Sequence, residues 1–300
     1  MSARIGGAVS GAGWLPVGAL CLALLTARDA LAQEGGERDA ARPLASSRLL
    51  RVCADPNNLP FSNEQGEGFE NKLAELLADR LGATLRYTWA PQRRGFLRTT
   101  LDAGACDLVM GVPSGYDRVR TTQPYYRSTY VFVYRADRGH DIRSLGDSVL
   151  RRLRIGVHLT GESNPPLAQA LAERGIIDNV VGYTIYGDYG RPDPPARLVQ
   201  AVARDDVDVA MVWGPLAGYF APRQAVPLVV VPVSAEDDDP GRQWTFAIAM
   251  GVRRADRAVA AELDRLLVSE RASIRRILDD YGVPRPAAAR RGASANHARP

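Results

Sequence analysis

Lysine is almost absent from this 300-residue chain, although arginine is abundant. Lys72 is the only lysine among the 38 basic Lys and Arg residues. A Schiff base and the GxxxxGK loop that holds nucleotide phosphates each need a lysine at a defined place, so the sequence argues against both chemistries. Lys72 lies on a predicted amphipathic helix, where a solvated side chain is the simplest interpretation.

Catalytic and metal-binding motifs are also missing. The sequence has no GxSxG, CxxC or HExxH pattern, and its three histidines are His140, His158 and His297. A lone histidine at a strand end, such as His158, is more often a hydrogen-bonded structural residue than a base or a ligand. We therefore predict no catalytic residue, no metal site and no cofactor.

Charge and hydropathy argue against a nucleic-acid-binding protein and against a membrane-spanning one. The formal net charge is only +4, and the arginines are scattered among acids without forming a run, which argues against a nucleic-acid partner. The one long apolar run, residues 15–25, is too short to span a bilayer. Ala30, Leu31 and Ala32 then form a small-x-small cleavage site, so residues 1–32 are predicted to be a signal peptide.

Export of the mature chain would place it in the periplasm, with no apolar run left for membrane insertion. A lipid anchor at Cys21 is the competing interpretation, but Leu20 stands where lipoprotein processing prefers a small residue. Residues 33–47 and 286–300 are polar and rich in small residues. We expect a flexible leader and a disordered tail there.

Two cysteines, Cys53 and Cys106, remain in the exported chain. In an oxidising compartment two cysteines are more often paired than free. Each lies in or beside a predicted strand, and a bridge requires the two α-carbons to approach within about 7 Å. The sequence leaves open both a disulfide and two buried thiols.

Strand and helix patterns alternate in the first half of the mature chain. The best-defined helix has Phe69, Leu73 and Leu77 at helical spacing and ends at Gly82. Right-handed connections make this βαβαβ unit a parallel sheet with helices on both faces, and ligands bind such sheets at the carboxyl ends of the strands. The predicted strands are 49–54, 84–90 and 106–112, and the predicted helices are 69–81 and 92–103.

A similar unit follows about a hundred residues later. The sequences DLVMGVP and DVAMVWGP each follow a helix pattern and end in glycine and proline, which indicates two α/β lobes. Two β-rich segments, 130–135 and 245–252, would carry the chain out of lobe 1 and back, and helices at 259–267 and 274–281 would pack on lobe 1. The remaining predicted elements are strands 154–159 and 207–213 and helices 167–174 and 198–203. We expect lobe 1 at 48–134 plus 245–285 and lobe 2 at 135–244.

The two lobes would enclose a cleft, and polar loops at strand ends are the candidates to line it. Asp55 to Phe61 is such a loop, stiffened by two prolines, although Asp55 and the asparagines can also form only local turns. Arg93 or Arg94 can clamp an anion or remain solvated, and Trp213 can cap an apolar ligand or pack between lobes. The candidate ligand-binding residues are Asp55, Asn57, Asn58, Phe61, Glu70, Arg93, Arg94, Val112, Pro113, His158, Thr160 and Trp213.

Three stretches carry a family resemblance over about residues 48–285: RVCADPNNLPFSNEQGEGFENKLAELLA, PQRRGFLRTTLDAGACDLVMGVPSGYD and TTQPYYRSTYVFVYR. With them the chain resembles the type II periplasmic solute-binding proteins of ABC importers. It is most similar to the branch encoded beside pyrroloquinoline quinone dehydrogenases, the J proteins of methanol dehydrogenase clusters. The resemblance implies a two-lobed α/β fold, each lobe a mainly parallel sheet flanked by helices, joined by two crossover strands. It also implies a quinoprotein alcohol dehydrogenase as partner, which such a protein would help to assemble or activate.

One departure from the importers concerns the segment after the third strand. Amino-acid binders of this superfamily carry a pattern like GMTxTxER, whose hydroxyls and arginine hold the substrate's carboxylate. Here Pro113 stands where a hydroxyl is expected, and Arg118 is out of register. Without a bidentate arginine an amino acid loses its main charge-assisted anchor.

Two other functions stay open at this point. An importer receptor would bind a small solute and contact an ABC permease, and it would have a small enclosed polar pocket. A dehydratase, known for a relative of this fold, would need a cleft acid with a raised pKa, for which Glu70 or Asp55 is the candidate. An accessory protein that is not an enzyme is the prediction we favour.

Overall fold

The computed structural model describes Leu44 and residues 48–159, 166–184, 190, 192–233 and 243–285. All of them belong to one compact unit that begins at Arg42. The predicted signal peptide, nearly all of the leader, the tail and Thr160 lie outside the described residues.

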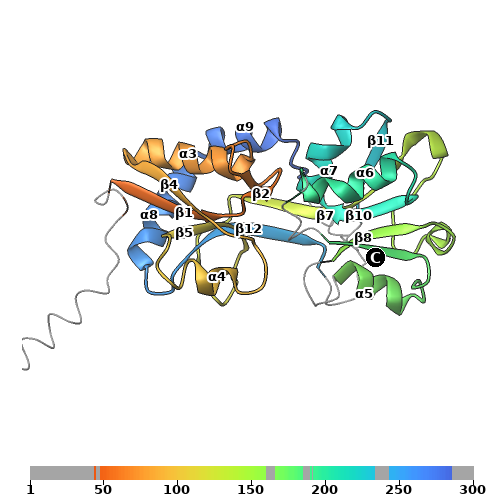
Figure 1. Cartoon of the computed structure of the whole chain (residues 1–300), viewed down its shortest axis with the longest axis horizontal. Helices are drawn as coiled ribbons and strands as arrows, with labels where there is room; N and C mark the ends of the chain where they lie inside the picture. The colour runs from red at the N-terminus through yellow and green to blue at the C-terminus, as the bar shows by residue number, and fades with distance from the viewer. Residues whose placement is uncertain are drawn as a thin grey trace, which may run out of the picture. The chain divides into compact units, whose positions relative to one another are not determined.

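Lobe 1 is built on three parallel strands in the order β4-β1-β5, as the βαβαβ pattern predicts (Figure 1). Val52 and Cys53 are neighbours on β1 whose side chains point to opposite faces, and both are fully buried, so the sheet is covered on both faces. The strand register joins Val52 to Tyr87 on one side and to Leu108 on the other. The strands are β1 (Leu49–Ala54), β4 (Thr84–Trp89) and β5 (Leu108–Pro113).

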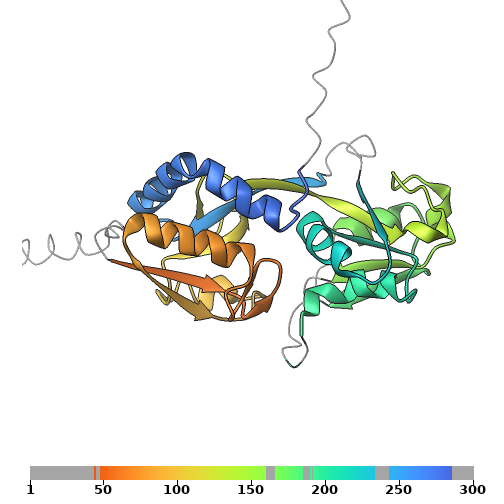
Figure 2. The ribbon, with the colours of Figure 1, turned by 90° about the horizontal axis from the view of Figure 1, so that it is seen from above.

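Helix α3 (Phe69–Leu81) confirms the best-defined helix of the sequence. The side-chain oxygen of Asn71 accepts the backbone N–H groups of Gly68 and Asn63, and the helix ends at Gly82 in a left-handed conformation. The C-terminal helices α8 (Arg257–Ser269) and α9 (Arg271–Asp280) return to this lobe, and Figure 2 shows α9 beside α3.

The second predicted helix, 92–103, is much shorter than expected. Only α4 (Phe96–Thr99) forms. Gly95 takes a left-handed conformation that a helix cannot continue through, and the hydroxyl of Thr100 donates to the carbonyl of Phe96. Gly95 thus stands before the helix, and Thr100, whose backbone is not helical (φ −121°, ψ −79°), ends it after a single turn.

Lobe 2 repeats the arrangement, with parallel strands in the order β10-β8-β9. The sequence prediction missed β9, β11 and α7. Helix α7 follows Trp213 directly and has Pro215 in its first turn, a position at which proline is tolerated. The strands are β8 (Ile155–Leu159), β9 (Val180–Thr184), β10 (Val209–Trp213) and β11 (Leu228–Pro232), and the helices are α5 (Pro166–Glu173), α6 (Arg197–Ala203) and α7 (Gly214–Phe220).

Two long strands join the lobes, β7 (Tyr126–Arg135) and β12 (Thr245–Val252). The start of β7 pairs with β12, which also pairs with β5 of lobe 1, whereas the end of β7 pairs with β10 and β11 of lobe 2. Strand β7 begins four residues before the predicted segment 130–135. The two-lobed fold joined by two crossover strands is therefore observed.

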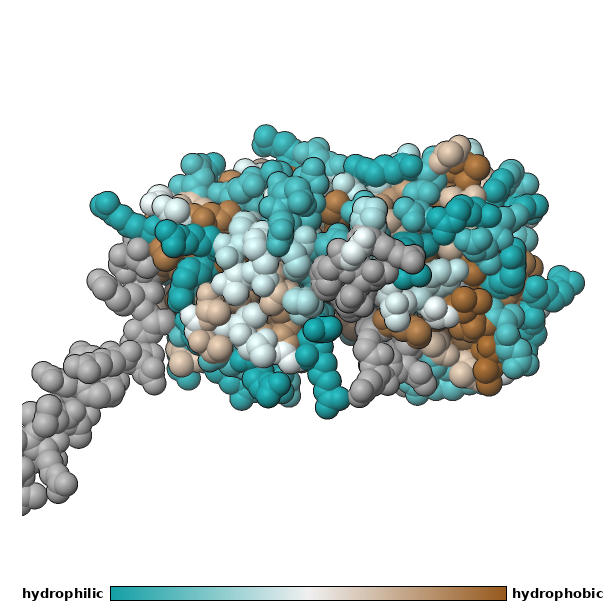
Figure 3. All heavy atoms as spheres, in the orientation of Figure 1, coloured by the Kyte–Doolittle hydropathy of each residue, from teal (hydrophilic) through white to brown (hydrophobic). Residues whose placement is uncertain are grey.

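Side chains of β7 alternate between two cores of lobe 2. Phe132 and Tyr134 pack with α5 on one face, while Val131 and Val133 pack with α6 and α7 on the other. This explains why residues 130–134 of β7 are all aromatic or aliphatic. On the face seen in Figure 3, hydrophilic residues dominate and hydrophobic ones gather over lobe 2.

Cys53 and Cys106 form a disulfide, with α-carbons 5.6 Å apart. Both cysteines are fully buried, and the bond ties β1 to the segment that leads into β5. Of the two alternatives left open by the sequence, the structure has the disulfide.

Short elements complete the described chain. No helix in it is both long and apolar enough to cross a membrane. The short strands are β2 (Asn57–Asn58), β3 (Ser62–Asn63) and β6 (Arg120–Thr121), and the short 3-10 helices are η1 (Ala136–Arg138), η2 (Ser148–Arg151), η3 (Pro194–Ala196) and η4 (Ala221–Arg223).

Candidate functional site

A cavity of about 350 Å³ lies between the two lobes, and we call it the inter-lobe cavity. Lobe 1 contributes the loop after β1 and the end of β5. Lobe 2 contributes β8, β10 and the starts of α5 and α7, and both crossover strands also reach it. The lining residues are Asn58, Phe61, Gly111, Pro113, Tyr130, Val157, His158, Leu167, Met211, Trp213, Leu216, Phe246 and Ile248.

Aromatic rings form one wall of the inter-lobe cavity. Trp213 contacts Tyr130 with ring centroids 5.3 Å apart and Phe246 with centroids 6.0 Å apart, both edge to face. The three rings are half-buried, so part of each is exposed in the cavity. Such a wall favours an aromatic or aliphatic group, and none of the described lining residues is an acid, a lysine or an arginine.

His158 is a polar residue of the cavity lining. The residue is 9% exposed, and its Nε2 has no hydrogen-bond partner among the described residues. Burial lowers the pKa of His158 to about 3, so the imidazole is neutral at any ordinary pH. The Nε2 atom has almost no accessible surface, so a bound group would reach it only if neighbouring side chains moved.

Asp55 is placed differently from the prediction, which had its carboxylate facing a ligand. Its side chain is 1% exposed and accepts the backbone N–H groups of Asn57, at 2.9 Å, and Gln92, at 2.7 Å. The Asn57 contact is the local turn that the sequence left open. The bond from Gln92 holds the loop after β1 to the loop after β4, and the side-chain amide of Asn58 also donates to the side-chain oxygen of Gln92. Asp55 therefore positions Asn58.

Glu70 lies behind the cavity wall. The Tyr125 hydroxyl donates to the Glu70 carboxylate at 2.8 Å and accepts the Gly111 N–H at 3.1 Å. Gly111 has a positive φ, and a Cβ there would stand 2.7 Å from a Glu70 oxygen. Only glycine lets the wall come this close to the carboxyl.

Burial raises the pKa of Glu70 to about 7, opposed by the hydrogen bond from Tyr125. The raised pKa is what the dehydratase interpretation requires. The position that a catalytic acid needs is not met, because Glu70 is 4% exposed and is not among the cavity's lining residues. A general acid must come within hydrogen-bond reach of the group it protonates.

The structure brings Asn58, Phe61, Pro113, His158 and Trp213 together around one cavity, as the sequence predicts. The other predicted residues lie elsewhere. Asn57 lines a separate surface cavity with Glu64 and Asp193, and Val112 packs in the lobe 1 core beside the disulfide.

Arg93 and Arg94 are exposed in the turn between β4 and α4 and do not line the inter-lobe cavity. The predicted anion clamp relied on a long helix beginning at 92. Because α4 is a single turn, it offers no aligned set of backbone N–H groups for an anion. Arg118 is exposed as well and lies outside the cavity.

Several lining residues were missed by the sequence prediction, which considered only the ends of parallel strands. Tyr130 and Phe246 lie on the two crossover strands, whose aromatic residues were the available signal. Leu167, Met211 and Leu216 belong to the lobe 2 cores as well as to the cavity, and their sequence pattern is that of core residues.

No group of three or more His, Cys, Asp or Glu side chains within the described ranges is arranged to hold a metal ion. The arrangement is instead that of a small apolar binding site with one neutral polar end.

Comparison with known proteins gives a consistent result. Residues 50–283 match the model of the bacterial extracellular solute-binding proteins, family 3. Protein MoxJ of Methylorubrum extorquens is 32% identical over 254 residues, which cover 82% of this chain and 84% of that protein.

Two crystal structures are similar in both sequence and fold. MxaJ of Methlophaga aminisulfidivorans superposes with a TM-score of 0.69 at 30% identity, covering 78% of this chain and 99% of that structure. The periplasmic binding protein XoxJ of Methylobacterium extorquens superposes with a TM-score of 0.66 at 35% identity, covering 80% and 100%.

Proposed function

The chain belongs to the bacterial extracellular solute-binding proteins of family 3, and we propose that it is a periplasmic accessory protein for a pyrroloquinoline quinone-dependent methanol or alcohol dehydrogenase. Its role would be to bind the dehydrogenase and assist its assembly or activation. The resemblance to proteins encoded beside such dehydrogenases supports this proposal, as does the similarity to MoxJ, MxaJ and XoxJ.

The observation that carries the proposal is the apolar character of the inter-lobe cavity. A zwitterionic or ionic solute would give up its hydration there without meeting an opposite charge among the described lining residues. An apolar side chain of a partner protein would instead cover Trp213, Tyr130 and Phe246. Buried aromatic anchors of this kind account for most of the binding energy at protein interfaces.

We further propose the chain organisation on which this role depends. Residues 1–32 would be removed on export, so that the mature protein begins at Gln33. Lobe 1 would comprise 48–134 with 245–285, and lobe 2 would comprise 135–244, with the inter-lobe cavity between them.

An importer receptor is the second candidate, and the polar residues Asn58 and His158 in the cavity lining favour it. They give the cavity a polar end that would suit one hydroxyl or amide of a small uncharged solute. Such a solute should co-purify with the protein and raise its melting temperature in the absence of any dehydrogenase. An ABC permease would then be the partner.

Replacing Trp213 by alanine tests the leading proposal. We expect the affinity of the mature protein for a purified quinoprotein methanol dehydrogenase to fall about 30-fold, the effect of losing about 2 kcal/mol at an aromatic anchor. Isothermal titration calorimetry measures the change. Trp89→Ala is the matched control, because Trp89 stacks on Tyr87 outside the cavity. Equal affinities of the wild type and the Trp213→Ala variant would rule out the cavity as the contact.

A further inference from the structure

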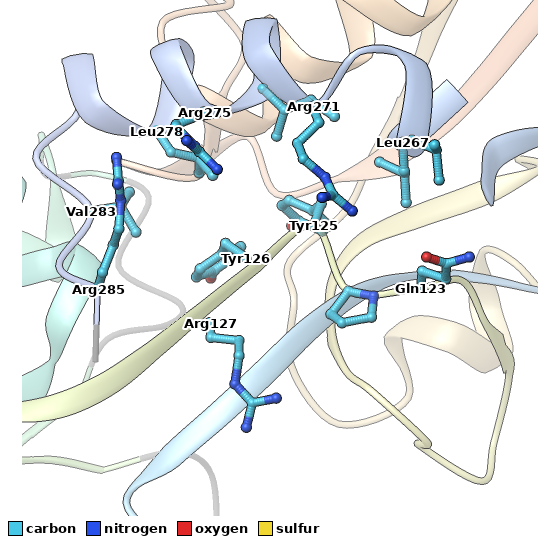
Figure 4. A pocket seen from close by; sticks show the side chains of 13 residues that line it. Gln123, Tyr125, Tyr126, Arg127, Leu267, Arg271, Arg275, Leu278, Val283 and Arg285 are labelled. Atoms are coloured by element: carbon cyan, nitrogen blue, oxygen red, sulfur yellow. The ribbon is translucent and has the colours of Figure 1, made fainter. Parts of the chain in front are cut away.

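A second cavity lies on lobe 1, between helix α9 and the start of β7 (Figure 4). Its volume is about 440 Å³. Arg271 and Arg275 project from α9 toward β7, Arg285 lies at one end beside Val283, and the side chain of Arg127 points from β7 away from α9. We call this surface, defined by its four arginines, the arginine groove. It shares strand β7 but no lining residue with the inter-lobe cavity.

The floor of the arginine groove is apolar. Tyr126, Ile274 and Leu278 are buried at its base, and Tyr126 lies at the centre of the opening in Figure 4. At one end Val268 is 54% exposed, which is unusual for a large aliphatic side chain. An apolar floor next to an exposed valine would be covered by an apolar group of a partner.

The rim of the arginine groove is rich in arginine, and the nearby carboxylate of Asp264 accepts the backbone N–H of the lining residue Gln123. Its described lining residues include four arginines and no acid. Arg271 and Arg275 are four residues apart on one helix face, a spacing at which like charges destabilise a helix. Of these four arginines, only Arg285 forms an ion pair with a described residue, Asp279.

Several arginines elsewhere in the described part of the chain pair with carboxylates. Arg51 pairs with Asp107 and Arg80 pairs with Glu270. In the arginine groove, the guanidinium groups of Arg271 and Arg275 flank an apolar floor, and neither has an ion pair with a described carboxylate. Guanidinium groups bind carboxylates through two parallel hydrogen bonds, so the chemistry that complements this rim is a set of carboxylates.

We propose that the arginine groove binds a short acidic segment of a partner protein, with carboxylates on Arg271 and Arg275 and an apolar side chain on the floor. The chain's own C-terminal residues 286–300 do not have this chemistry, since they contain arginines and no acid. This surface goes beyond the function proposed for the inter-lobe cavity, because it gives the protein a second and electrostatic contact.

The test uses a defined probe and the whole mature protein. The probe is a fluorescein-labelled ten-residue peptide of glutamate with leucine at every third position, and its control is the same peptide with glutamine in place of glutamate. Fluorescence anisotropy measures the affinity. We expect the glutamate peptide alone to bind, and its affinity to fall about tenfold when salt is raised from about 50 mM to about 500 mM, because partly exposed charges are screened.

Charge-removing variants then locate the site. Arg271→Gln with Arg275→Gln should weaken binding of the glutamate peptide at least about tenfold. The matched control, Arg265→Gln with Arg276→Gln, removes the same charge from exposed positions on α8 and α9 outside the groove and should change the affinity less than about twofold. Trp213→Ala should leave peptide binding unchanged, so this result is independent of the dehydrogenase titration.

Four results would overturn the proposal. One is equal binding of the glutamate and glutamine peptides, and another is equal loss of affinity in both double variants. In a third, the peptide does not bind, but the protein binds vesicles of anionic phospholipid and loses this binding on Arg271→Gln with Arg275→Gln. The groove would then be a membrane contact. In the fourth, the peptide again does not bind, but the protein self-associates and the same double change abolishes this. The groove would then be an interface between two copies of this chain.

Discussion

Replacing Cys53 and Cys106 together by alanine is expected to lower the free energy of unfolding by about 4 kcal/mol. The disulfide closes a loop with a sequence separation of 53 residues, and for such a loop the chain-entropy model gives about that loss. In a domain of this size the melting temperature should fall by roughly 10 °C. Guanidinium chloride denaturation of the two proteins measures the difference.

Reductant provides the control for this prediction. Unfolding the wild type in the presence of dithiothreitol should move its midpoint toward that of the alanine variant, whereas the variant's own midpoint should not move. Cys53 and Cys106 are fully buried, so reduction should occur mainly from the unfolded state. A wild-type midpoint that reductant leaves unchanged would show that the disulfide contributes no stability.

The second large effect concerns pH. The folded-state pKa of Glu70 is raised to about 7, whereas an exposed glutamate titrates near 4.5. An acid whose pKa is raised by folding contributes most stability below its unfolded pKa and loses that contribution as pH rises through its folded pKa. Between pH 4.5 and about 8 the wild type should therefore lose about 3 kcal/mol through Glu70 alone.

Glu70→Gln isolates this contribution. Glutamine keeps an oxygen for the Tyr125 hydroxyl and carries no charge, so the variant should lack the loss and be the more stable protein at pH 8. Thermal unfolding of both proteins across this pH range measures the difference. Tyr125→Phe should shift the loss to higher pH, because the Tyr125 hydrogen bond lowers the pKa of Glu70. Parallel stability curves for the wild type and Glu70→Gln would contradict the account.

The regular parts of the fold were predictable because each carries a strong local signal. Helix α3 has apolar residues at helical spacing and a glycine where it ends, and the structure confirms its bounds. The family resemblance carried by the three long stretches is confirmed as well. The fold of two lobes joined by crossover strands followed from that resemblance together with the βαβ pattern.

The missed elements have weak or misleading local signals. Strand β9 is half exposed at a sheet edge, and among the described strands β11 pairs with β7 alone, so neither has the continuous burial of a central strand. Helix α7 begins at Gly214 and Pro215, which read in sequence as a turn. The single turn of α4 depends on backbone conformation at Gly95, which no apolar pattern reveals.

The candidate site was predictable where a side chain ends a parallel strand, as for Pro113, His158 and Trp213. It was not predictable where three-dimensional pairing brings distant segments together. Phe246 reaches the inter-lobe cavity because β12 crosses between the lobes beside β7. Burial of Asp55 depends on the loop at Gln92, thirty-seven residues away. Thr160 lies outside the described residues, and its role stays a prediction.

The structure separates two surfaces of opposite chemistry. The inter-lobe cavity is aromatic, with one neutral imidazole, whereas the arginine groove is apolar at its floor and cationic at its rim. A partner protein that inserts an apolar group into one and an acidic segment into the other would bind more tightly than through either alone, provided its geometry spans both. The two tests above separate these contributions.

The central claim is that a quinoprotein dehydrogenase contacts the inter-lobe cavity, and site-directed photo-cross-linking tests it most directly. Pro113, which is exposed at the cavity, is replaced by a benzophenone amino acid. The resulting protein is mixed with purified methanol dehydrogenase and irradiated. The account predicts a cross-link to the dehydrogenase from this position and none from the same amino acid at Arg276. No cross-link from Pro113, or equal cross-linking from both positions, would contradict it.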